Sequence, residues 1–217
     1  METKKKLSFG RLHDFTKRVF DIVFSIVAIL LFSPIMLIIF IILKLKCPKN
    51  SVIFTQKRLG EYEKEIKVYK FTTMVPHAEE ILNELLEKDE VLREEYLTHR
   101  KLKDDPRIIP GIGNFLRSTS LDELPQFYNV LRGEMTVVGP RPYIKDEFNG
   151  QLNIIRKKIT SLKPGLTGYW QILPSRNSST FEDRIANDLK YIENQTIFLD
   201  MEIIFKTIIV MVLRKGT

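Results

Sequence analysis

The longest apolar stretch of the chain covers residues 22–43 and reads Ile22-Val-Phe-Ser-Ile-Val-Ala-Ile-Leu-Leu-Phe-Ser-Pro-Ile-Met-Leu-Ile-Ile-Phe-Ile-Ile-Leu43. Its 22 residues carry no charge, and only two serines and one proline interrupt the apolar side chains. About 20 apolar residues in a helix cover the hydrocarbon core of a bilayer, which is roughly 30 Å thick. We therefore expect this stretch to enter a membrane, with the rest of the chain arranged around it.

Three arrangements fit this stretch: a cleaved signal peptide, a helix that spans the bilayer, and a re-entrant hairpin. A signal peptide is disfavoured because the stretch is too long and no small-residue cleavage site follows it. Basic residues are retained on the cytoplasmic side of a membrane. Lys17 and Arg18 precede the stretch, and Lys44, Lys46 and Lys49 follow it. The charges therefore assign both ends to the same face, which favours the re-entrant hairpin over the span.

A break in the membrane helix is expected at Ser33 and Pro34. The proline ring clashes with the carbonyl of Leu30 and removes one backbone donor, and the Ser33 hydroxyl can donate to an acceptor freed in this way. The two arms then have roughly 15 and 12 residues and lengths of about 22 and 18 Å, so neither spans the core alone. We predict a re-entrant helix-break-helix over residues 18–45.

The composition predicts one folded domain behind the membrane segment. Among 217 residues there are 34 Lys or Arg and 27 Asp or Glu, which gives a net charge of +7, and 44% are hydrophobic. These values exclude intrinsic disorder and a polytopic membrane bundle. The single cysteine, Cys47, excludes an intramolecular disulfide. We expect a basic N-terminal segment over residues 1–17, the membrane hairpin over 18–45, and one cytoplasmic domain over 46–217.

The sequence pattern of this cytoplasmic domain predicts a helix-rich α+β fold. Residues 51–56 and 66–71 read as short strands joined by a turn at 59–63, which is a β-hairpin. Residues 79–95 are strongly acidic and have apolar side chains at helical spacing, which predicts one solvated helix with a packed face. Residues 197–213 are apolar with a few charges, which fits a helix packed on the domain or one lying at the membrane interface.

The adjacent carboxylates Asp122 and Glu123 are the candidates for chemistry. Ser120 and Glu123 have the spacing of a helix capping box, so a purely structural role is the alternative. Arg117 lies just upstream and Arg141 lies in a proline-fixed turn, a combination suited to holding a diphosphate. Two acids can share a divalent metal, and an aspartate is an established nucleophile toward phosphorus.

A glycine-punctuated loop over residues 164–171 contains Trp170, the only tryptophan. The ring fits a core plug or an interfacial anchor, while Gln171 and Arg176 could contact a sugar or a nucleotide, and the sequence leaves both readings open. The basic charge indicates phosphate-bearing partners such as anionic lipid or a nucleotide. Nucleic acid is not expected, because the aromatic residues are not interleaved with basic ones as on an exposed binding sheet.

Several motifs in order along the chain point to one family. They are Lys17-Arg-Val-Phe-Asp21, Phe32-Ser-Pro34, Phe54-Thr-Gln-Lys-Arg58, Tyr69-Lys-Phe71, Ser120-Leu-Asp-Glu-Leu124, Val138-Gly-Pro-Arg-Pro142 and Pro164-Gly-Leu-Thr-Gly168. The chain resembles the bacterial sugar transferases, the monotopic phosphoglycosyl transferases that load a polyprenyl phosphate. The resemblance runs from about residue 17 to residue 213, and the chain resembles the minimal catalytic form.

The resemblance implies transfer of a hexose 1-phosphate from a UDP-sugar to undecaprenyl phosphate with release of UMP. The expected place is the cytoplasmic face of the bacterial inner membrane, at the first membrane step of polysaccharide assembly. It further implies a Mg²⁺-dependent reaction in which Asp122 attacks the β-phosphorus and forms a phosphosugar-aspartyl intermediate. Glu123 would place the metal together with Asp122 or activate the acceptor. The cations expected to neutralise the diphosphate are Lys70, Arg117 and Arg141.

The sequence departs from the family pattern at two places. Thr72 stands where many members have a basic residue, and the loop from Gln171 to Arg176 is one residue longer than usual and lacks a glycine. A second hypothesis is a non-enzymatic membrane-anchored adaptor that binds anionic lipid or a protein partner through its basic face. A homo-oligomer is compatible with the sequence, and the residues do not name the sugar.

Overall fold

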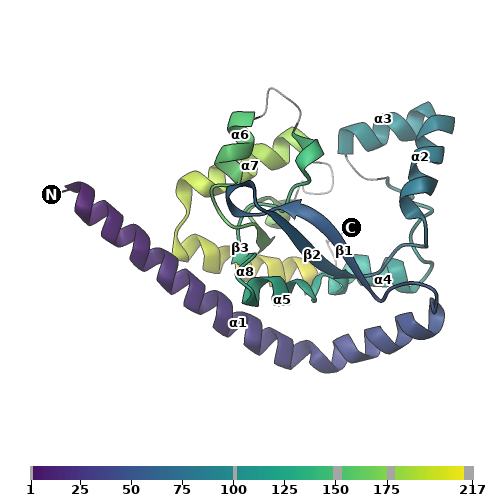
Figure 1. Ribbon diagram of the computed structural model, residues 1–217, viewed down its shortest axis with the longest axis horizontal. Helices are drawn as coiled ribbons and strands as arrows, with labels where there is room; N and C mark the ends of the chain where they lie inside the picture. The colour runs from purple at the N-terminus through teal and green to yellow at the C-terminus, as the bar shows by residue number, and fades with distance from the viewer. Residues whose placement is uncertain (1, 100–101, 149–152, 175–178, 213–217) are drawn as a thin grey trace.

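The computed structural model describes residues 2–99, 102–148, 153–174 and 179–212. In this part of the chain, a long helix, α1 (Glu2–Lys46), passes beneath a smaller domain that the other elements form (Figure 1). The fold is α+β and rich in helices, as the sequence predicts. The remaining α-helices are α2 (Ala78–Lys88), α3 (Glu90–His99), α4 (Ile112–Thr119), α5 (Gln126–Leu131), α6 (Asn153–Ile159), α7 (Phe181–Asn194) and α8 (Ile197–Val212). The strands are β1 (Ile53–Leu59), β2 (Glu65–Phe71), β3 (Thr136–Val138) and β4 (Gly165–Thr167), and the short 3₁₀ turns are η1 (Glu61–Glu63), η2 (Leu121–Glu123), η3 (Lys145–Glu147) and η5 (Trp170–Ile172).

Helix α1 bends but is not interrupted (Figure 1). Its backbone stays helical through Ser33 and Pro34, so the expected break is a bend within one helix. The Ser33 hydroxyl donates to the carbonyl of Leu30 at 2.9 Å, the carbonyl that the ring of Pro34 deprives of its helical donor. The sequence-based role of Ser33 at the bend is therefore confirmed.

One side of α1 packs against the domain and the other side is apolar and exposed. Ala28, Ile39 and Leu43 are buried against β1, β2, α4 and α5. By contrast, Leu30 and Leu31 are 70% and 67% exposed, and the other side chains along this exposed face are also mostly apolar. The segment Asp14–Lys46 is long and apolar enough to cross a membrane. An apolar surface of this size is expected to lie against lipid rather than water.

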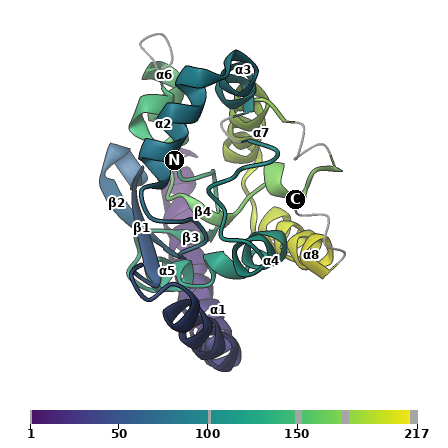
Figure 2. The ribbon, with the colours of Figure 1, turned by 90° about the vertical axis from the view of Figure 1, so that its right-hand side faces the viewer.

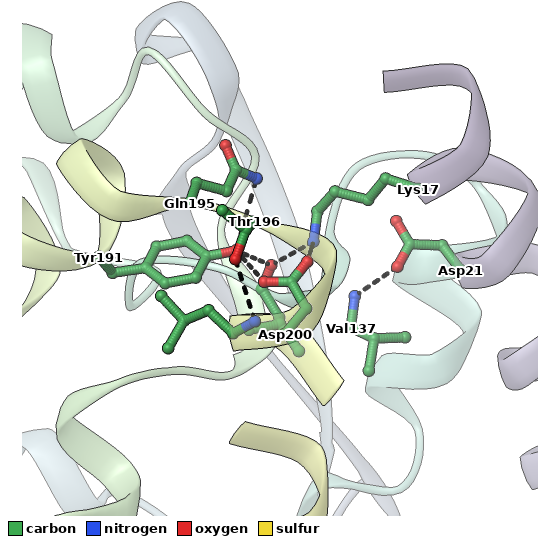
Figure 3. Close-up of polar contacts among 9 residues, drawn as sticks. Lys17, Asp21, Val137, Tyr191, Gln195, Thr196 and Asp200 are labelled. Atoms are coloured by element: carbon green, nitrogen blue, oxygen red, sulfur yellow. Dashed lines mark hydrogen bonds and ion pairs between the residues drawn. The ribbon is translucent and has the colours of Figure 1, made fainter. Parts of the chain in front are cut away.

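Polar contacts hold the first half of α1 to the domain (Figure 3). The Lys17 ammonium donates to Asp200 Oδ2 at 2.5 Å and to the Val138 carbonyl at 2.9 Å. The Tyr191 hydroxyl donates to Asp200 Oδ1 at 2.7 Å, and Asp21 Oδ1 accepts the Val137 N–H at 2.9 Å. We name the contact among Lys17, Tyr191, Asp200 and the Val138 carbonyl the Lys17 clamp. It joins α1, α7, α8 and β3 at one point.

Arg18 adds a second attachment between α1 and the domain. Its guanidinium donates to the carbonyls of Val130 and Leu131 at 2.6 and 2.7 Å, at the C-terminal end of α5. These carbonyls lack partners within their own helix, and a cation there also complements the helix dipole. The Lys17-Arg18 dipeptide just before the apolar stretch therefore serves as a docking element.

The predicted β-hairpin is confirmed with shifted ends. β1 pairs antiparallel with β2, with Ile53 opposite Phe71 and Leu59 opposite Glu65. Alternation along β2 buries Ile66 and Val68 in the core. Lys70 follows on the same face of the strand, where its partly exposed side chain contacts Glu123.

A second sheet of two short parallel strands joins two of the sequence motifs. Thr136 of β3 pairs with Gly165 of β4, and Val138 pairs with Thr167. The backbones of Gly139 and Gly165 approach so closely that a Cβ at Gly139 would lie 2.6 Å from the Lys163 carbonyl oxygen. Glycine is needed here because the two turns contact each other backbone to backbone. The sequence did not predict this sheet.

The acidic run at residues 79–95 forms two helices rather than the single predicted one. α2 ends at Lys88, and Asp89 starts α3 by accepting the N–H groups of Val91 and Leu92 at 2.9 and 3.1 Å. An aspartate in this position favours the start of a new helix over continuation of the old one. Both helices lie on the side of the domain away from the bend of α1 (Figures 1 and 2). The acidic surface is thus kept away from the apolar one.

Helix α8 combines the two alternatives that the sequence left open. Ile203 and Ile204 pack in the core with Tyr191 of α7 and Met135, so one face belongs to the domain. The other face is apolar and exposed, with Phe198 and Phe205 at 87% and 65% exposure. That second face has the character expected of a helix at a membrane interface.

Candidate active site

Asp122 and Glu123 lie on a single 3₁₀ turn, η2, between α4 and α5. Ser120 ends α4 in the left-handed conformation (φ 56°, ψ 19°), and its hydroxyl caps no helix. A capping serine needs an extended backbone, so the capping-box interpretation of Ser120 and Glu123 is wrong. A true capping box occurs at Thr180 and Asp183, where α7 begins. The turn leaves the Asp122 side chain buried beside that of Glu123.

Lys70 is the cation in direct contact with the carboxylate pair. Its ammonium lies 2.6 Å from Glu123 Oε1, and both side chains are about one-third exposed. β2 supplies Lys70 and η2 supplies Glu123, so the contact depends on the packing of the hairpin against the turn. The sequence-predicted cation is thus placed at the carboxylates by a strand 53 residues away.

The two carboxyl groups differ in their electrostatic surroundings. Burial raises the pKa of Asp122 to about 7, and the adjacent Glu123 acts in the same direction against Lys70 and Arg117. Burial also raises the pKa of Glu123, but Lys70, Arg141 and Arg58 together outweigh it and hold that pKa below its usual value. Adjacent carboxyl groups whose pKa values are pushed apart are typical of catalytic pairs.

The structure brings three predicted cations together around this pair. Arg117 comes from the last turn of α4, and its charge acts on Asp122. Arg141 follows β3 and acts on Glu123. With Lys70, these residues form a cationic surround from three separate elements, and neither arginine forms an ion pair with a carboxylate of the described residues. Such a surround fits a ligand that brings its own negative charge.

Arg58, at the end of β1, is a further cation of the site that the sequence did not single out. Its Nη1 donates to the Pro142 carbonyl at 3.2 Å and lies 3.8 Å from a Glu147 carboxylate oxygen. Burial, followed by the charge of Arg141, lowers the pKa of Arg58 to about 10. Its position in the Phe54-Thr-Gln-Lys-Arg58 motif is the feature of the sequence that could have identified it as a site residue. Arg58 braces the turn that carries Arg141.

Asp188 of α7 fixes the same turn from the other side. Its Oδ2 accepts the Arg141 N–H at 3.1 Å and the Tyr143 hydroxyl at 2.8 Å. The guanidinium of Arg141 then lies 5.7 Å from the centre of the Trp170 ring and 6.0 Å from that of Tyr143. No sequence pattern indicated Asp188, because it acts across 47 residues.

The buried Asp188 carboxyl predicts how the folding stability of the protein depends on pH. Burial raises the pKa of this carboxyl from 3.8 to about 6. Between these values the folded protein keeps a proton that the unfolded chain has released, so stability falls as the pH rises. Two pKa units correspond to about 3 kcal/mol. We expect the wild type to lose about this much stability between pH 4 and 6. Asp188→Asn retains an oxygen acceptor but does not titrate, so it should not show this loss. Thermal unfolding in detergent measures the difference, and parallel pH curves would contradict it.

Gln171 and Thr72, which the sequence also singled out, form hydrogen bonds away from the carboxylate pair. Gln171 Nε2 donates to the Leu166 carbonyl at 3.3 Å, which ties η5 to β4. Thr72 donates its hydroxyl to the Ser51 carbonyl at 2.5 Å, so this departure from the family pattern joins the two ends of the β-hairpin. Arg176 lies outside the described residues. Within the described ranges there is no group of three or more metal-ligating side chains, so Asp122 and Glu123 stand as a pair.

Comparison with known proteins identifies the family. The family model described as bacterial sugar transferase matches residues 12–214. The chain is 41% identical over 202 residues to the undecaprenyl-phosphate galactose phosphotransferase of Salmonella typhimurium, covering 93% of this chain and 41% of that protein. It is 41% identical over 201 residues to the exopolysaccharide production protein ExoY of Rhizobium meliloti, covering 93% and 87%. It is 38% identical over 201 residues to the UDP-glucose:undecaprenyl-phosphate glucose-1-phosphate transferase of Escherichia coli, covering 88% and 39%. The chain thus spans about two fifths of two of these relatives and most of the third, and it belongs to the bacterial sugar transferase family.

Proposed function

We propose that this protein transfers a hexose 1-phosphate from a UDP-sugar to undecaprenyl phosphate and releases UMP. The observation that carries the proposal is the carboxylate pair Asp122–Glu123 within a cationic surround, in a chain with an exposed apolar helix. The names of the relatives supply the substrate classes, since they include galactose and glucose phosphotransferases acting on undecaprenyl phosphate.

In the first step, an Asp122 carboxylate oxygen attacks the β-phosphorus of the UDP-sugar. A bond forms between that oxygen and phosphorus, and the bond from phosphorus to the bridging oxygen breaks. The electron pair stays on the bridging oxygen, which leaves as part of UMP. An anionic nucleophile approaches an anionic diphosphate here, so Lys70, Arg117 and Arg141 are needed to offset the repulsion.

In the second step, a phosphate oxygen of the lipid attacks the same phosphorus. The bond between phosphorus and Asp122 breaks, and the carboxylate is regenerated. Glu123 stays ionised because of its contact with Lys70, so it is available to accept a proton from the lipid phosphate or to hold a metal. The product is a sugar joined to the lipid through a diphosphate.

The carboxylate pair also fits a Mg²⁺ ion. Burial and, after it, the charge of Glu123 raise the pKa of Asp122, and a divalent cation beside the pair would favour the ionised form of both carboxyl groups. Mg²⁺ is commonly held by one or two carboxylates together with substrate phosphates and water, so Asp122 and Glu123 are sufficient protein ligands. When bound, Mg²⁺ would neutralise charge on the diphosphate.

We further propose that α1 is re-entrant and that the domain lies at the cytoplasmic face of the bacterial inner membrane. Both ends of the apolar stretch contact the same domain: Asp21 accepts from Val137, and Leu43 is buried beside Val52 and Phe71. A helix that crossed the bilayer would carry these ends to opposite faces. The bend at Pro34 lets the helix enter and return instead.

Cysteine labelling tests this topology. In a Cys47→Ser background, we expect a membrane-impermeant maleimide to label neither Ser8→Cys nor the control Glu87→Cys in intact cells, and to label both after permeabilisation. The reason is that residues on both sides of a re-entrant segment face the same compartment. Labelling of Ser8→Cys alone in intact cells would sink the re-entrant proposal.

A screen of UDP-sugars tests the reaction. The purified full chain is incubated with undecaprenyl phosphate, Mg²⁺ and one UDP-sugar at a time, and UMP release is measured. We expect release with one sugar or a small set of sugars, and a phosphosugar adduct on the protein by intact mass spectrometry when the lipid is omitted. The lack of UMP release with every sugar would reject the proposed function and favour the adaptor hypothesis.

A further inference from the structure

Two arginines share the ring of Trp170. The Arg184 guanidinium carbon lies 5.3 Å from the ring centre and that of Arg141 lies 5.7 Å from it. Arg141 comes from the turn after β3, Arg184 from the first turns of α7, and Trp170 from η5. Contacts of this kind attract each cation to the ring, and the ring holds two like charges in one place. We name these three residues the arginine–tryptophan cluster.

Arg184 is buried without a carboxylate partner. The residue is 4% exposed, and its Nη2 donates to the backbone carbonyls of His99 and Ser179 at 3.1 and 3.2 Å. Among the described residues no carboxylate forms an ion pair with it; Glu147, whose charge acts on Arg184, accepts the Ile144 N–H and lies beside Arg58. Buried arginines are rarely left without an anion, because burying an unpaired charge is costly.

Two buried donors in the cluster also lack an acceptor. Arg184 Nε and Trp170 Nε1 are both shielded from solvent and have no hydrogen-bond partner in the described part of the chain. Each of these atoms can only donate. An unmet buried donor is unfavourable, and a ligand that supplies acceptor oxygens would satisfy these two. Two adjacent guanidiniums further require that these oxygens be negatively charged.

Arg141 places the cluster next to the carboxylate pair. Its charge lowers the pKa of Glu123, and it also lowers the pKa of Arg184 after the larger effect of burial. Arg141 is therefore the common neighbour of Glu123 and Arg184.

We propose that Arg184 and Arg141, held by Trp170, bind the phosphate that stays on the nucleoside and leaves as UMP. This inference rests on the proposed function. When the bond between the β-phosphorus and the bridging oxygen breaks, the electron pair moves to that oxygen and adds one negative charge to the departing phosphate. A second guanidinium beside Arg141 at this position would stabilise the leaving group.

Binding of UMP to the full chain in detergent tests the assignment by calorimetry. We expect Arg184→Met to weaken UMP binding by about 10- to 100-fold, the loss expected for charge-assisted hydrogen bonds, and to leave uridine binding unchanged. Arg184→Lys should recover part of the loss. The matched control is Lys190→Met on the same helix as Arg184, which removes an exposed cation from the ring of Tyr169. Equal UMP binding in Arg184→Met and wild type, or equal losses for UMP and uridine, would overturn the assignment.

Trp170 provides a second test that needs no variant. It is the only tryptophan of the chain, so its fluorescence reports on the cluster alone. We expect UMP to change the emission saturably, and uridine at the same concentration to change it little. An emission that stays constant while calorimetry shows UMP bound, or that responds equally to uridine, would overturn the assignment. If the wild type fails to release UMP from any UDP-sugar, the proposed function fails; if it releases UMP and these tests fail, only the assignment does.

Discussion

Replacing Asp122 by asparagine should abolish UMP release from the UDP-sugar that the screen identifies. Asparagine keeps the size of the side chain but cannot form the bond to phosphorus, so we expect turnover to fall by about 10³-fold or more, as when a nucleophile is removed. The phosphosugar adduct should also disappear from the mass spectrum. UMP release and intact mass, measured on the same preparation, check both expectations.

This loss should not come from unfolding. The fold raises the pKa of Asp122 to about 7, which means that it disfavours the ionised side chain. The neutral asparagine is therefore expected to leave the unfolding temperature near pH 8 equal to that of the wild type or higher. Asp146→Asn, at an exposed position of η3, serves as the matched control and should keep full activity. Wild-type turnover in Asp122→Asn would show that another residue is the nucleophile.

Replacing Lys17 by methionine should have the largest effect on stability. The Lys17 clamp is largely shielded from solvent, with 14% exposure for the Lys17 side chain and 8% for that of Asp200. Removal of one partner from a buried ion pair leaves the other charge uncompensated and costs about 3–5 kcal/mol. For a chain of this size we expect the unfolding temperature in detergent to drop by roughly 6–12 °C or more.

A double variant separates the charge from the packing. Asp200→Asn added to Lys17→Met removes the unpaired carboxylate, so we expect it to recover part of the lost stability. The control is Lys158→Met, which opens an exposed ion pair with Glu193 and should cost less than about 1 kcal/mol. Equal unfolding temperatures for Lys17→Met and Lys158→Met would show that the clamp does not stabilise the protein.

The elements that could be predicted from the sequence are those with a strong local pattern. The apolar run predicted helix over the second part of α1 but a break where the helix only bends, and the alternation at 66–71 predicted β2. Ser33 was correctly expected to serve the carbonyl of Leu30. The pair β3–β4 was missed because each strand has three residues and its partner lies far along the chain. The division of residues 79–95 was missed because apolar spacing does not register the start of a new helix at Asp89.

In the candidate site, too, residues in short local motifs could be predicted and residues defined by long-range contacts could not. Asp122, Glu123, Lys70, Arg117 and Arg141 stand in short motifs, and the structure brings them together although it does not test their roles. Asp188 and Arg184 had no signal, because their importance arises from burial and from contacts between distant segments. Ser120 and Glu123 show how a local pattern can mislead: the spacing of a capping box is present, but the backbone of Ser120 is left-handed and Glu123 contacts Lys70 instead.

The Lys17 clamp has a consequence for biosynthesis. It joins residues 183 positions apart and meets the carbonyl of Val138, just before the turn that carries Arg141. A ribosome makes α1 long before Asp200, so Lys17 meets its carboxylate partner only after α8 has been synthesised. A chain without α8 would have α1 docked less firmly and the Arg141 turn less well supported. The contact between α1 and the Arg141 turn is therefore completed only after α7 and α8 have been made.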